Sequence, residues 1–145
     1  MAKKILATLD LGSNSFHLLI VVASDHNQIQ VIAKHKQQVQ LRSGIDESGN
    51  LSREVLEKAL LCLREFGWII KEHNAEYVKV IGTYTARKLS DRKKFKTLAK
   101  AALGYEVDII AGEEEARLIC VGANWKNQLD NKQILLGSVN KIIAI

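Results

Sequence analysis

The sequence predicts an α/β sandwich built around a mixed sheet, and three observations lead to this prediction. Two short apolar runs rich in β-branched residues lie near the N-terminus, with a small polar turn between them. Further along the chain, apolar residues recur three and four positions apart, which is the spacing of one helix face. Short apolar runs then alternate with these helical stretches, and that order of elements is typical of α/β folds.

An antiparallel meander is expected to open the chain. Lys4 to Asp10 and Phe16 to Ala23 have the length and composition of buried strands. Gln28 to Leu41 is expected to continue as a third strand, because apolar and polar positions alternate within it. The polar stretch from Arg42 to Asn50 contains two glycines and is predicted to be a loop.

Helices and strands are expected to alternate after this loop. Ser52 is placed to cap a helix whose apolar positions repeat as far as Ile70. Tyr77 to Gly82 is predicted to be a short buried strand. Ser90 is then expected to cap a second helix, and Gly104 to end it.

The last predicted elements are a strand and a third helix. Glu106 to Ile110 would be the fifth strand of the sheet. Gly112 would open the helix, with Glu113, Glu114 and Glu115 in its first turn. Acidic residues are favoured there by the helix dipole, so a well-made helix start explains them without any catalytic role.

Composition bounds the class of protein. A domain of 145 residues can bury about 68–70% of its unfolded surface, and 47% apolar with 26% charged residues is typical of a globular protein. No apolar span is long enough to cross a membrane. Cys62 and Cys120 lie far apart among apolar residues, which favours two reduced core thiols and a cytoplasmic location.

Basic residues are concentrated between Arg87 and Lys100, where Asp91 is the single acid. Such a run is usually a solvated helix face, but it also attracts polyanions such as nucleic acid, nucleotide or polyphosphate. The sequence lacks a nucleic-acid recognition motif, and Phe95 is the one aromatic residue in the run. A nucleic-acid partner is therefore not expected.

The turn between the first two strands could bind an anion. Gly12 would allow a positive φ, Ser13 and Ser15 offer hydroxyl groups, and consecutive amides of such a turn can converge on a phosphate. Asp10, at the end of the strand before the turn, could hold a metal ion or a water molecule. A plain turn would explain the same residues, because Gly, Ser and Asn are common in turns.

Two further polar groups follow strand ends. Arg87 comes after the Tyr77 to Gly82 strand, and Glu115 after the Glu106 to Ile110 strand. Ligands of open α/β sheets bind at the carboxyl ends of the strands, so both groups are expected at the same edge as the turn. An arginine there could clamp a phosphate, and a carboxylate could deprotonate a water molecule.

Three motifs together resemble one family. They are Asp10-Leu-Gly-Ser-Asn-Ser-Phe-His17, Thr83-x-Thr-Ala-Arg87 and Gly112-Glu-Glu-Glu-Ala-Arg-Leu-Ile119. In this order they resemble the exopolyphosphatase and guanosine pentaphosphate phosphatase family, in register from about Ile5 to Gly122. The resemblance implies a ribonuclease H-like lobe of the actin-like ATPase superfamily, with a mixed five-stranded sheet.

The resemblance also implies roles for these residues. Glu115 would be the catalytic base, and Asp10 would take part in catalysis by holding a metal ion. Phosphate would be bound by Arg87 and by the turn, which consists of Gly12, Ser13, Asn14 and Ser15. The implied reaction is hydrolysis of the terminal phosphoanhydride of polyphosphate or guanosine pentaphosphate, assisted by Mg²⁺.

The chain departs from the family pattern near its end. The family continues into a second phosphate loop and a second domain, whereas this chain reads Gln133-Ile-Leu-Leu-Gly-Ser-Val-Asn-Lys-Ile-Ile-Ala-Ile145. We therefore expect a phosphatase lobe at residues 1–126 and an apolar tail at 127–145, through which a second copy or another chain could pair. The alternatives are a lobe that binds polyphosphate or nucleotide without turnover, and a truncated, inactive remnant.

Overall fold

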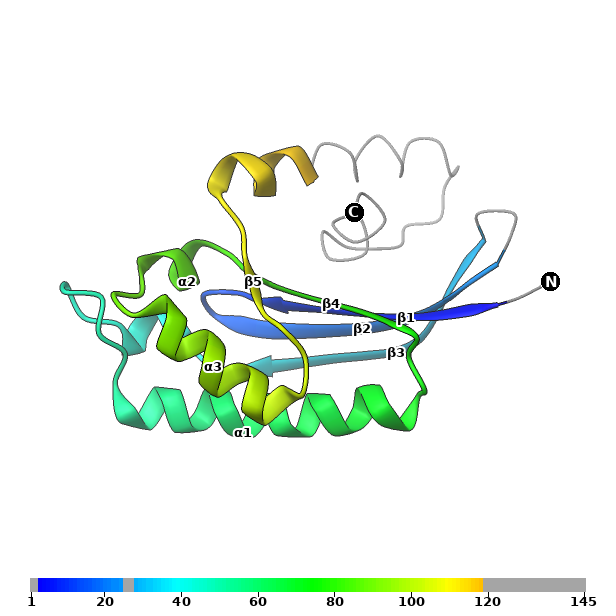
Figure 1. The fold of residues 1–145 in the computed structure, drawn as a ribbon, viewed down its shortest axis with the longest axis horizontal. Coiled ribbons are helices and arrows are strands. Elements are labelled where there is room, and N and C mark those ends of the chain that lie inside the picture. The colour runs from blue at the N-terminus through cyan, green and yellow to red at the C-terminus, as the bar shows by residue number, and fades with distance from the viewer. Residues whose placement is uncertain (1–2, 25–27, 119–145) are drawn as a thin grey trace.

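The structure is a computed structural model that describes residues 3–24 and 28–118. The predicted apolar tail at 127–145 and Cys120 lie outside the described residues. Five strands form one mixed sheet in the order β3-β2-β1-β4-β5 (Figure 1). They are β1 (Lys4–Leu11), β2 (Ser15–Ala23), β3 (Ile29–Gln38), β4 (Tyr77–Gly82) and β5 (Asp108–Ile109).

The sheet combines antiparallel and parallel pairs. β2 is antiparallel to both β1 and β3, which confirms the predicted meander. β4 is parallel to β1, and β5 is parallel to β4, so these three strands end at the same edge of the sheet. This edge is at the left of Figure 1, beside α2 (Tyr84–Lys88).

The main core lies between one face of the sheet and two helices, α1 (Arg53–Glu72) and α3 (Arg92–Leu103). Both helices cover the same face in Figure 1. Gly67 lets them approach each other, because a side chain there would collide with the backbone carbonyl of Leu103. Strand β2 alternates between the two faces: Leu18 and Ile20 belong to this core, whereas Leu19 and Val21 pack on the other face.

The helix of residues 112–118 covers the opposite face of the sheet (Figure 1). Leu118 is fully buried there and packs with Ile81 and Ile110. This packing determines where the first turn of the helix lies relative to the strand ends. Within residues 3–24 and 28–118, no helix combines the length and apolarity needed to cross a membrane.

The helix caps confirm two predictions and correct a third. The Ser52 side chain accepts a hydrogen bond from the Val55 amide, and Gly104 ends α3 with a φ of 91°. The prediction that Ser90 caps α3 is wrong. The cap is Asp91, whose carboxylate accepts from the Lys94 amide at 2.9 Å, because α3 begins one residue later than the pattern indicated.

Several element boundaries also differ from the prediction. β3 ends at Gln38, because Gln40 adopts a left-handed conformation with φ 56° that starts the 3₁₀ turn η1 (Leu41–Gly44). The predicted strand from Glu106 to Ile110 is reduced to the two residues of β5. Residues 84–88, where no helix was predicted, form α2.

Candidate functional site

The turn between β1 and β2 is shaped by a close approach of its own backbone. The Gly12 amide donates to the Ser15 carbonyl at 3.1 Å, and a Cβ atom at Gly12 would lie only 2.8 Å from that carbonyl oxygen. The φ of Gly12 is not positive, so the predicted reason for this glycine is wrong. The position requires glycine because there is no room for a side chain.

The carbonyl groups of the turn accept hydrogen bonds from residues 39–42, the segment that follows β3. The Ser13 carbonyl accepts from the Arg42 amide at 2.9 Å, and the Asn14 carbonyl accepts from the amides of Val39 and Gln40. Within the described part of the chain, the amides of Ser13 and Asn14 donate no hydrogen bond. Two consecutive free amides in a turn are the donors that an anion-binding nest requires.

An open cavity lies beside the turn. It has a volume of about 520 Å³ and is lined by Ser13, Asn14, Gln40, Arg42 and Ser43. Arg42 supplies the single formal charge among these residues. Sequence analysis did not select Arg42, since nothing in the predicted loop distinguished it from an ordinary surface base.

α2 turns sharply back after β4. Gly82 permits this turn, because a Cβ atom there would lie 2.9 Å from the Cβ of Ala86. The buried Thr85 of α2 contacts the turn between β1 and β2. Its hydroxyl oxygen lies 2.5 Å from the hydroxyl oxygen of Ser13. This hydrogen bond joins the β1–β2 turn to the helix that also carries Arg87, and the sequence motif did not predict it.

Arg87 and Glu115 form an ion pair at this edge. Arg87 Nη1 donates to Glu115 Oε2 at 3.1 Å and to the Ile110 carbonyl at 2.8 Å. The two side chains are about one-fifth exposed, at 22% and 23%. In the described ranges, the Nη2 and Nε groups of Arg87 donate to no protein atom, so three N–H groups remain for a ligand.

Asp10 and Ser15 lie in the strands beside this pair. Asp10 is the second-last residue of β1, opposite His17 of β2 and Ile81 of β4. Ser15 is buried at the start of β2. The structure therefore brings Ser13 to Thr85 and Arg87 to Glu115, while Asp10 reaches the same edge through its position in the sheet.

The residues present limit how a metal ion could be held. In the part of the chain that the structure describes, no three carboxylate, histidine or cysteine side chains gather into a metal site. Mg²⁺ usually keeps several water molecules and binds through one or two carboxylates together with substrate phosphates. Asp10 fits this mode of binding only when a phosphate ligand supplies further oxygens.

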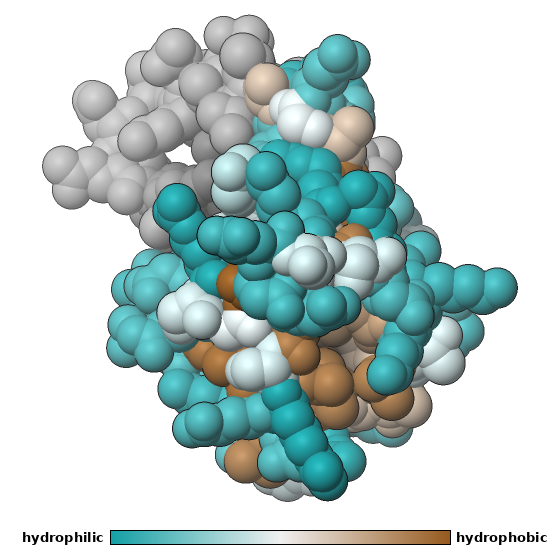
Figure 2. Space-filling view, turned by 90° about the vertical axis from the view of Figure 1, so that its left-hand side faces the viewer, coloured by the Kyte–Doolittle hydropathy of each residue, from teal (hydrophilic) through white to brown (hydrophobic). Residues whose placement is uncertain are grey.

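The site edge is mainly hydrophilic. Figure 2 looks onto this end of the molecule and shows polar surface over most of it, with an apolar patch in its lower part. Fold and site together define an α/β lobe of the ribonuclease H-like, actin-like kind, with polar groups gathered at the carboxyl ends of parallel strands. The model of the Ppx/GppA phosphatase family matches residues 20–136, and the chain belongs to this family.

Known proteins of the family support this assignment. The chain is 35% identical over 130 residues to the guanosine-5'-triphosphate,3'-diphosphate pyrophosphatase of Aeromonas hydrophila, covering 90% of this chain and 26% of the relative. The Aquifex aeolicus PPX-GPPA enzyme superposes with a TM-score of 0.81 at 25% identity, over 88% of this chain and 42% of that one. An exopolyphosphatase from Cytophaga hutchinsonii gives a TM-score of 0.79 at 29% identity, over 84% and 39%. The chain thus spans about a quarter of the curated relative's length.

Proposed function

We propose that this lobe binds the terminal phosphate of inorganic polyphosphate or guanosine pentaphosphate and supplies the groups that hydrolyse it. The observation that carries the proposal is the placement of Arg87. One of its nitrogens holds Glu115, while its remaining N–H groups are available to a phosphate. The relatives named as a guanosine pentaphosphate pyrophosphatase and an exopolyphosphatase suggest the two substrates.

The turn would bind the phosphate oxygens. The amides of Ser13 and Asn14 would donate to them, Gly12 would keep the turn compact, and the Ser15 hydroxyl would add a further donor. Arg87 would bind the same group from α2, since a guanidinium can donate two parallel hydrogen bonds to phosphate.

Glu115 would act as the general base. Its carboxylate would take a proton from a water molecule, whose oxygen would then attack the terminal phosphorus. A new P–O bond forms to water while the bond to the bridging oxygen breaks, and the shortened chain leaves with that oxygen. Arg87 would orient the carboxylate and neutralise charge that develops on the phosphoryl oxygens.

Asp10 would hold Mg²⁺ jointly with the phosphate, whose oxygens would complete the set of ligands. When bound, the ion would supply charge neutralisation of the phosphate oxygens. We also propose a cytoplasmic location, because Cys62 is a buried free thiol and disulfides are rare in that compartment.

The test is phosphate release from long-chain polyphosphate and from guanosine pentaphosphate in the presence of Mg²⁺. Replacing Glu115 by Gln should lower the rate by about 10²–10⁴-fold, the usual contribution of a general base. Glu113→Gln is the matched control, because Glu113 occupies the same helical turn and is exposed. Equal rates in the wild type and Glu115→Gln would remove Glu115 from the role of base.

Binding without turnover is a second candidate function. It is favoured by the ion pair, because the Glu115 carboxylate is already engaged by Arg87. The same assay separates the two functions when tripolyphosphate binding is measured beside it. Binding that depends on Arg87, with no phosphate release by the wild type, would support the binding lobe.

A further inference from the structure

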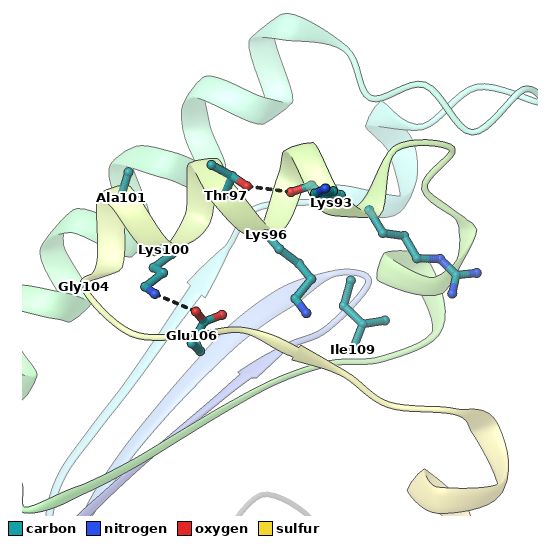
Figure 3. A pocket seen from close by; sticks show the side chains of 9 residues that line it. Lys93, Lys96, Thr97, Lys100, Ala101, Gly104, Glu106 and Ile109 are labelled. Carbon is teal, nitrogen blue, oxygen red and sulfur yellow. Dashed lines mark hydrogen bonds and ion pairs between the residues drawn. The ribbon is translucent and has the colours of Figure 1, made fainter.

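A second groove, with several charged side chains in its lining, lies between α3 and the segment that contains β5. Its volume is about 990 Å³ (Figure 3). It is lined by Arg92, Lys93, Lys96, Thr97, Lys100, Ala101, Gly104, Glu106 and Ile109. The lining contains none of the residues assigned above to the candidate site.

Charge in this groove is strongly unbalanced. Four lining residues are cationic and one, Glu106, is acidic. Lys100 Nζ lies 2.6 Å from Glu106 Oε1, and this hydrogen bond lowers the pKa of the Glu106 carboxyl. Elsewhere in the described residues, no carboxylate forms an ion pair with Lys93 or Lys96. Four cations balanced by a single carboxylate leave the groove with an excess of positive charge, which attracts anionic ligands.

The arrangement of the cations favours a linear ligand. Arg92, Lys96 and Lys100 are four residues apart, so they form one row with a rise of about 6 Å between neighbours. Figure 3 shows Lys96 and Lys100 projecting from α3 toward the segment of Glu106 and Ile109. No lining residue is aromatic, so the groove offers no platform on which nucleic-acid bases could stack.

One hydrogen bond connects this groove to the candidate site. Arg92 Nη2 donates to the backbone carbonyl of Arg87 at 2.6 Å. The row of cations on α3 therefore begins at Arg92, whose side chain contacts the backbone of the residue that would bind the terminal phosphate. A chain of phosphates held by Arg87 could continue along the row, whereas a compact ligand would end at the site.

We propose that the α3–β5 groove binds the part of a linear inorganic polyphosphate chain that extends beyond the terminal phosphate. This proposal rests on the proposed function, since it assumes that the chain end lies at Arg87. The groove would raise the affinity for long chains and leave that for tripolyphosphate unchanged.

The test measures binding of long-chain polyphosphate and of tripolyphosphate to the 145-residue chain by calorimetry. In the variant Lys96→Gln/Lys100→Gln, affinity for the long chain should fall about fivefold or more at low salt, because two cation–phosphate contacts of the row are lost. Its affinity for tripolyphosphate should stay at the wild-type value. The control Lys58→Gln/Lys71→Gln removes the same charge from exposed positions on α1 and should match the wild type for both ligands.

Equal losses in the groove and control variants would overturn the proposal, because net charge alone would then explain binding. An RNA oligonucleotide that loses affinity in the groove variant and is not displaced by polyphosphate would overturn it in favour of a nucleic-acid surface. Failure of the proposed function has a different signature: phosphate release, or tripolyphosphate binding, would then be insensitive to Glu115 and Arg87. The groove variant alters neither residue.

Discussion

Arg87 joins α2 to the helix of residues 112–118 through one nitrogen, which donates to the Glu115 carboxylate and to the Ile110 carbonyl. The two residues are 28 positions apart in the chain and about one-fifth exposed. Because the pair is partly shielded from water, it should contribute more than a fully exposed pair. A substitution in this pair is therefore expected to change both the stability of the fold and the proposed reaction.

The Arg87→Lys variant should lose both stability and phosphate affinity. A lysine keeps the charge but lacks the planar guanidinium. The guanidinium donates to the Ile110 carbonyl and the Glu115 carboxylate and has further N–H groups for a phosphate. We expect a loss of about 1–2 kcal/mol in the free energy of unfolding, measured with urea, and about tenfold weaker tripolyphosphate binding. The control is Arg53→Lys, whose pair with Glu57 is 91% and 66% exposed and should cost less than about 0.5 kcal/mol. Equal effects of the two substitutions would contradict the special position of Arg87.

The Gly12→Ala variant should disturb the first turn. Its Cβ would lie 2.8 Å from the Ser15 carbonyl oxygen, so the backbone must shift, at a cost of about 1–3 kcal/mol. Phosphate affinity should fall as well, because the amides of Ser13 and Asn14 would move. Gly104→Ala is the comparison: it costs stability through its left-handed φ but has open space around it, so it should leave phosphate affinity unchanged. Unaltered binding by Gly12→Ala would argue against the turn as a phosphate cradle.

The hydroxyl pair of Ser13 and Thr85 should show measurable coupling. Ser13→Ala and Thr85→Val each remove the hydrogen bond between the turn and α2. Each should lower the free energy of unfolding by about 0.5–1.5 kcal/mol, and the double variant should cost less than the sum of the two. Strict additivity in a double-mutant cycle would show that the two hydroxyl groups do not interact.

Cys62 should make stability depend on alkaline pH. Burial, with a smaller contribution from Glu65, raises the pKa of its thiol from 9.0 to about 12. Because the folded-state pKa is raised, the contribution to stability is complete below about pH 9 and is lost as pH rises toward 12. The difference in unfolding free energy between wild type and Cys62→Ala should therefore shrink by about 2 kcal/mol between pH 9 and pH 10.5. A difference that stays constant over this range would contradict a shifted thiol.

Most of the fold could be predicted from the sequence. The apolar run of β2, the alternation in β3 and the helical spacing after Ser52 are local patterns of the sequence, and the structure has strands and a helix there. The common edge of the candidate residues also follows, because β1, β4 and β5 are parallel and end together. Boundaries were less predictable, since the end of β3 depends on the left-handed Gln40 and the start of α3 on Asp91.

By itself, the sequence determined the order of the five strands and the longer helices, the family and the residues that gather at one sheet edge, because periodicity and motif spacing are local properties of the chain. Only the tertiary structure decided which of these residues touch. The hydrogen bond between Ser13 and Thr85 joins positions 72 residues apart, and the pair of Arg87 and Glu115 requires α2 and the last described helix to pack beside the same strands. Such contacts depend on how the elements pack on the two faces of the sheet, and no short stretch of sequence contains that information.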